Sequence, residues 1–119
     1  MRALFPLALA IVALFSMPAQ ANDIVPVVGE YHGSREIHST PYEVFFKLDG
    51  IHVQKVRLVI NKHLVHLDIV TQRSAHSFEA HNGSYEVDGH WLHNRSVHCE
   101  IIHLVKPKTR IGSLEAHHQ

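Results

Sequence analysis

Histidine is the residue type in this chain with the clearest capacity for chemistry. The 119 residues include 13 histidines, and all of them lie after position 31. Neutral imidazole is the commonest side-chain ligand of transition metals, and its pKa near 6.5 makes it sensitive to mild acid. The composition therefore favours a transition-metal site, with zinc, copper or nickel as candidates, or a surface whose charge follows pH.

Metal ligands in this chain must come together across strands. His63-x-x-His66 and His90-x-x-His93 have a spacing that shares one face only in a helix, and both pairs lie in strand-like sequence. A hairpin at Asn82-Gly83 would instead place Glu79 opposite Glu86, with His76 and His81 nearby. Facing carboxylates repel one another unless a positive group lies between them. The pairing predicts a cation or a protonated histidine there; the alternatives are a register slip or two carboxylates splayed into water.

A second candidate site lies across the expected Asn94-Arg95 turn, which pairs His90 with Cys99. A thiolate and an imidazole are suitable ligands for zinc or copper. Cys99 is the only cysteine, so no disulfide can form within the chain. An inert core thiol and an intermolecular disulfide remain alternatives. The predicted metal ligands are His76, Glu79, His81, Glu86, His90 and Cys99.

The elements that must position these residues are short β-strands. Val, Ile, Tyr, Phe and Thr recur in short runs separated by turn dipeptides, a pattern typical of antiparallel sheets. We therefore predict an all-β fold, a small antiparallel barrel or two-layer sandwich of about seven or eight short strands. The predicted strands are Val27 to Ile37, Tyr42 to Leu48, Ile51 to Ile60, His63 to Val70, His76 to His81, Ser84 to Val87, His90 to His93 and Ser96 to Val105.

The register is clearest at the Asn61-Lys62 turn. A two-residue turn there places Val56 opposite Leu67 and Leu58 opposite Val65, which forms one apolar face. On the other face Lys55 would meet Asp68 and Arg57 would meet His66. Opposite charges in register favour this pairing by about 0.2–1 kcal/mol each.

The N-terminus has the pattern of a cleaved secretory signal helix, residues 1–21. Arg2 precedes an uncharged apolar run, and Ala19-Gln20-Ala21 is a small-x-small cleavage site. The run is shorter than the roughly 20 residues of a spanning helix, so a retained anchor is the weaker alternative. We expect export to the periplasm or the exterior, a single β domain at 22–107 and a flexible C-terminal tail at 108–119, with no membrane span after signal removal.

The charge balance and the motifs of the sequence disfavour several classes of function. Eleven basic and eleven acidic residues balance, which disfavours nucleic acid or an anionic membrane as the main partner. Apart from a Cys99–histidine pair, the sequence has no recognisable nucleophile motif, so we expect no enzyme. The predicted function is an exported, non-catalytic, His-rich binding domain with zinc or copper as candidate ligands. The alternative is a metal-independent module with a pH-sensitive surface: a partner of an envelope or extracellular protein, an inhibitor, or a carrier of a small apolar ligand.

Overall fold

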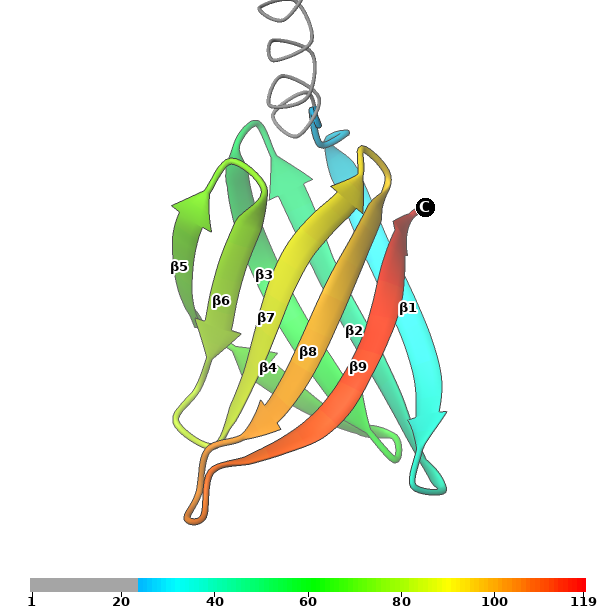
Figure 1. Ribbon diagram of the computed structural model, residues 1–119, viewed down its shortest axis with the longest axis vertical. Helices are drawn as coiled ribbons and strands as arrows, with labels where there is room; N and C mark the ends of the chain where they lie inside the picture. Colours follow the sequence, from blue (N-terminus) through cyan, green and yellow to red (C-terminus); the bar gives the residue numbers. More distant parts are fainter. Residues whose placement is uncertain (1–23) are drawn as a thin grey trace, which may run out of the picture.

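The protein is an antiparallel β-barrel. The computed structural model describes residues 24–119, and the expected signal peptide lies outside them. Within this part of the chain no helix is long and apolar enough to span a membrane. Nine strands form one sheet (Figure 1), against about seven or eight predicted. They are β1 (Gly29–Ile37), β2 (Thr40–Asp49), β3 (His52–Ile60), β4 (His63–Leu67), β5 (Ile69–Ser74), β6 (Ser77–His81), β7 (Tyr85–His93), β8 (Ser96–His103) and β9 (Thr109–His118).

The sheet closes almost completely on itself. Its strand order is β4-β3-β2-β1-β9-β8-β7-β6-β5, so β4 and β5 are the two ends. The chain passes from β4 to β5 through Asp68, which brings β5 back beside β3. At that closure the Val53 backbone N–H donates to the side-chain Oε1 of Gln72 at 2.7 Å. Of the two architectures predicted, the structure has the barrel, in a nearly closed form.

The β3–β4 hairpin has the predicted register. Asn61 and Lys62 have φ values of 48° and 72°, as a tight hairpin turn requires. Val56 pairs with Leu67 and Arg57 with His66. The ladder ends at Val56, so the predicted pairing of Lys55 with Asp68 does not form.

The predicted strands Ser84 to Val87 and His90 to His93 are one strand, because no turn forms at the intervening Asp88-Gly89. Both residues lie inside β7, which runs without a break from Tyr85 to His93. Gly89 pairs with Phe78 of β6, and a Cβ at Gly89 would lie 2.2 Å from the Phe78 ring. Glycine is therefore required here by the close approach of an aromatic ring, a role that glycine in strands often has.

The predicted flexible tail is also wrong, because residues 109–118 form β9. This strand pairs with β8 along its length and with β1 at Tyr31 and His32, so it joins the two halves of the barrel. Leu114 and Ala116 are buried, whereas Glu115 and His117 are exposed. The segment thus has the period of two of a half-buried strand, without the β-branched run that makes such strands easy to recognise.

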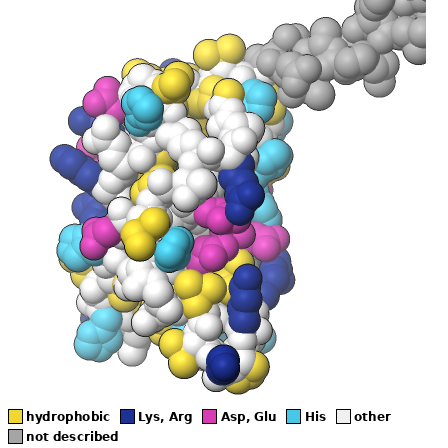
Figure 2. All heavy atoms as spheres, turned by 90° about the vertical axis from the view of Figure 1, so that its left-hand side faces the viewer, with side chains coloured by type: hydrophobic (Ala, Val, Ile, Leu, Met, Phe, Trp, Pro, Cys, Tyr) yellow, Lys and Arg dark blue, Asp and Glu magenta, His cyan; other side chains and the backbone are white. Residues whose placement is uncertain are grey.

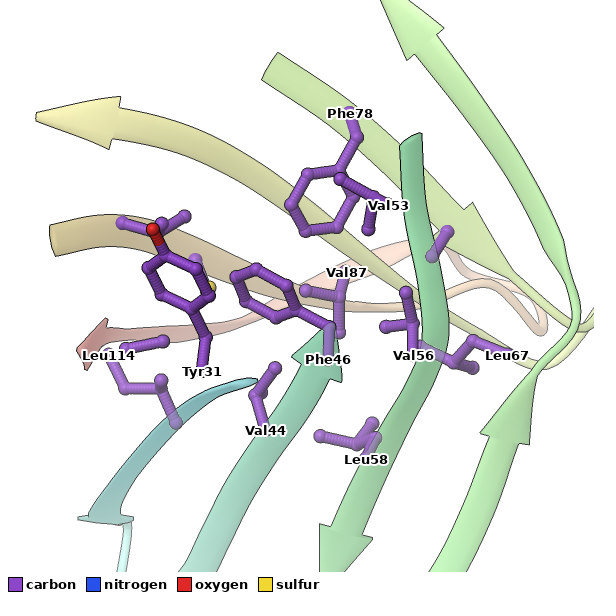
Figure 3. Close-up of a cluster of buried hydrophobic side chains, with 14 of the residues drawn as sticks. Tyr31, Val44, Phe46, Val53, Val56, Leu58, Leu67, Phe78, Val87 and Leu114 are labelled. Carbon is purple, nitrogen blue, oxygen red and sulfur yellow. The ribbon is translucent and has the colours of Figure 1, made fainter. Parts of the chain in front are cut away.

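Aromatic side chains fill the barrel interior. Tyr31 stacks on Phe46 with ring centroids 5.0 Å apart, and Phe46 meets Phe78 at 5.1 Å. The Trp91 ring packs edge-on against Phe46, and its indole N–H donates to the Tyr31 hydroxyl at 3.3 Å. Aliphatic side chains from β2, β3, β4, β7 and β9 surround this cluster (Figure 3). The core therefore occupies the space that an apolar ligand would need in an open barrel.

Candidate cation site on the outer face

Polar side chains on the outer face of β6, β7 and β8 stand in register. Glu79 pairs with Asp88, and Asp88 pairs with Glu100, so three carboxylates cross three strands in one row. His81 pairs with Glu86 in the neighbouring row. Because side chains alternate between the faces of a strand, all of these residues point away from the core.

Three of these carboxylates converge. Glu79, Glu86 and Asp88 each offer an oxygen, and the three oxygens lie within 4.8 Å of one another. We call these residues the carboxylate trio; each is half-buried. Among the residues that the structure describes, no other three His, Cys, Asp or Glu side chains bring their ligand atoms so close together.

Asp88 has the most perturbed environment in the trio. Its partial burial raises its pKa to about 7, helped by a hydrogen bond with Glu86 and by the charges of Glu86, Glu79 and Glu100. Its Oδ1 is inaccessible to solvent and has no hydrogen-bond partner. Buried polar atoms are seldom left unpaired, so this oxygen has an unused capacity to accept a ligand.

Basic side chains flank the acidic residues without neutralising all of them. Arg73 of β5 places Nη2 2.7 Å from Glu79 Oε2, and Arg110 of β9 places Nε 3.4 Å from Glu100 Oε1. Glu86 and Asp88 have no such guanidinium partner among the described ion pairs. Figure 2 shows acidic side chains gathered in one place, basic side chains above and below them, and histidines spread over the face.

The predicted pairing of Glu79 with Glu86 is shifted by two residues. Glu79 pairs with Asp88, because the β6–β7 connection is wider than the two-residue turn expected at Asn82-Gly83. Asn82 Oδ1 accepts the backbone N–H groups of Ser84 and Tyr85, both at 2.9 Å, which stabilises the wider turn. A shift of two leaves every side chain on its predicted face, so Glu79 and Glu86 still come together.

Asp88 is the member of the trio that the sequence did not indicate. Its position before Gly89 made it look like a turn residue. The signal that identifies it is alternation: Glu86 and Asp88 are separated by one buried residue, Val87, as two residues on the same face of a strand must be.

The predicted pair of His90 and Cys99 does not form. A bulge between Trp91 and His93 shifts the β7–β8 register by one, so His90 pairs with His98 and Cys99 with Gly89. A one-residue shift turns side chains to opposite faces. His90 is exposed, whereas Cys99 is fully buried, and burial raises the pKa of its thiol to about 12.

The remaining predicted ligands lie outside the trio. His76 is in the turn between β5 and β6 and lines a different hollow, together with Ile24 and Ile51. His81 stands opposite Glu86, but no nitrogen of its ring is among the converging atoms. His90 and His98 line an open hollow of about 290 Å³ that also includes Glu79, Asp88 and Glu100. The structure thus brings carboxylates together, with imidazoles beside them.

No protein-family model, curated protein or solved structure matches this chain.

Proposed function

We propose that this protein is an exported, non-catalytic binding protein that holds a divalent cation at the carboxylate trio. The convergence of three carboxylate oxygens within 4.8 Å carries the proposal. The buried, unpartnered Oδ1 of Asp88 supports it independently, because a bound cation would supply the interaction that this atom lacks.

The donor set favours a hard cation. Calcium, magnesium and manganese prefer carboxylate oxygens, whereas copper and zinc bind imidazole and thiolate well. The trio supplies three oxygens and water can complete the coordination. This changes the metal expected from the histidine content, because the imidazoles of His81, His90 and His98 lie beside the trio rather than among its converging atoms.

Two features disfavour two of the alternatives, a carrier of an apolar ligand and an enzyme with Cys99 as its nucleophile. The aromatic cluster around Phe46 occupies the interior that an apolar-ligand carrier would leave open. Cys99 was the one candidate nucleophile, and its buried thiol has a pKa of about 12, far above that of a reactive cysteine.

Calorimetric titration of the mature protein at pH 8 with calcium, manganese, zinc and copper tests the proposal. We expect saturable binding of calcium or manganese with Kd of about 10⁻⁴ to 10⁻³ M, the range of weak extracellular calcium sites. Glu86→Gln should weaken binding about tenfold or more, because affinity follows the number of charged ligands. Arg73→Gln should strengthen it, because the guanidinium competes for Glu79.

Glu115→Gln is the matched control, since it removes an exposed outer-face carboxylate of β9 outside the trio. Equal weakening by Glu86→Gln and Glu115→Gln would overturn the site, and so would the absence of saturable binding. Zinc or copper binding that survives Glu86→Gln but is lost when His90 and His98 are both changed to alanine would place the metal on the imidazoles instead.

A further inference from the structure

The closure of the barrel leaves an open groove between β3 and β5. The β3–β4 ladder ends at Val56, so His52 to Gln54 pair only with β2, Lys55 at the bulge pairs with neither neighbouring strand, and β5 pairs only with β6. We call the space between these two strand edges the β3–β5 groove. One hollow, of about 620 Å³, lies between Val53–Arg57 and the end of β4 with Asp68 (His66–Asp68). Another, of about 310 Å³, lies between His52 and Gln72–Ser74.

Side chains occupy hydrogen-bonding positions at the edge of β3 that a neighbouring strand would fill. The Val53 N–H donates to Gln72 Oε1 at 2.7 Å rather than to a backbone carbonyl. The Lys55 carbonyl accepts from Arg57 Nε at 3.2 Å. Unpaired strand edges are templates for pairing with another chain, and these two contacts are interactions that an incoming strand could replace.

The groove has an apolar floor and a basic rim. Val53, Val56 and Leu67 are buried at its base. Lys55, Arg57 and His66 line its outer side, with Asp68 as the acidic residue among the lining side chains. In an extended segment successive side chains point to opposite faces. A segment that alternates apolar and acidic residues would therefore place its apolar side chains on the floor of the groove and its acidic side chains beside Lys55.

We propose that the β3–β5 groove binds an extended, acidic segment of a partner protein by strand addition. The segment would form backbone hydrogen bonds with the edge of β3, displace the Gln72 side chain from Val53, and complete the barrel. This inference does not rest on the cation site, which lies on the outer face of β6 and β7, although Arg73 lies beside both sites.

The test is a titration of the ¹⁵N-labelled protein, followed by NMR, with a blocked heptapeptide in which valine and glutamate alternate. We expect a saturable shift of the Val53 amide resonance and a submillimolar Kd. Methylation of alternate peptide nitrogens should abolish binding, since it removes the backbone donors. Replacing the glutamates by lysines should weaken binding about tenfold, because like charges are then apposed.

Protein variants locate the binding. Lys55→Glu should weaken binding about fivefold or more. Lys62→Glu, the same charge change at the exposed β3–β4 turn outside the groove, should leave it unchanged. Gln72→Ala should strengthen binding, because the Val53 N–H then has no side-chain acceptor within the protein. This variant also tests the inference if Lys55→Glu fails to fold. The inference would be overturned if the N-methylated peptide bound as well as the unmodified one, or if the Val53 amide resonance did not shift. It would also be overturned if the protein self-associated instead of binding the peptide, or if no binding occurred.

Discussion

The inner and outer faces of β6, β7 and β8 share one hydrogen-bonded ladder but differ in how their side chains are matched. On the inner face, Phe78, Gly89 and Cys99 stand in one row, and the large ring of Phe78 occupies the space beside the glycine. On the outer face the adjacent row consists of Glu79, Asp88 and Glu100. The inner row combines complementary sizes, whereas the outer row combines like charges.

This difference separates stability from function within a single set of strands. Like charges directly opposite one another destabilise a sheet, and one buried Asp88 oxygen has no partner. The apolar interior must therefore offset the cost of the outer row. Residues that break a local rule in this way are more often explained by function than by stability.

The largest expected effect is on the free energy of unfolding, when alanine substitutions at two neighbouring residues, one on each face, are compared. Phe78→Ala removes a buried ring that packs against Phe46 and Trp91, and it should lower the free energy of unfolding by about 3–5 kcal/mol. Glu79→Ala, one residue along, should change it by no more than about 1 kcal/mol, because an ion pair at the protein surface contributes little. Urea unfolding measures both, and similar losses would contradict the division between the faces.

A second prediction concerns pH and the cation-free protein. The pKa of Asp88 is raised to about 7 in the folded state, so the folded protein binds its proton more tightly than the unfolded chain does. This contribution to stability is complete below about pH 4 and is lost as pH rises through 7. Relative to Asp88→Asn, the wild type should therefore become less stable between pH 4 and 8.

Urea unfolding in the presence of a chelator measures this trend as the difference between the two proteins, so that contributions from the histidines cancel. Asp49→Asn, which removes an exposed carboxylate at the end of β2, serves as the control. A difference between wild type and Asp88→Asn that stays constant with pH would contradict the environment assigned to Asp88.

The smallest expected effect on function comes from Cys99. Its buried thiol, with a pKa of about 12, should not react with a disulfide reagent at pH 8 until the protein unfolds. Cys99→Ala should leave cation affinity unchanged while lowering stability. Rapid labelling of the native protein, or loss of cation binding in Cys99→Ala, would contradict the buried position of Cys99 and favour the predicted pair with His90.

Short-range features of the fold were predictable. The hairpin at Asn61-Lys62 follows from a turn that tolerates positive φ and from alternation on both sides of it. The all-β class follows from the same two signals, repeated along the chain. Glu79 and Glu86 could be placed together because a register error of two residues preserves the face of every side chain.

The chain's alternation and turn residues therefore specify which segments extend and which side chains share a face. They do not specify what fills a gap or where a bulge falls. Gly89 belongs to a strand because the Phe78 ring packs beside it. His90 faces away from Cys99 because of the bulge after Trp91, and the last residues form β9 because both β1 and β8 offer edges to pair with. Each of these outcomes depends on how neighbouring strands pack and pair, and the carboxylate trio depends on the wider β6–β7 turn.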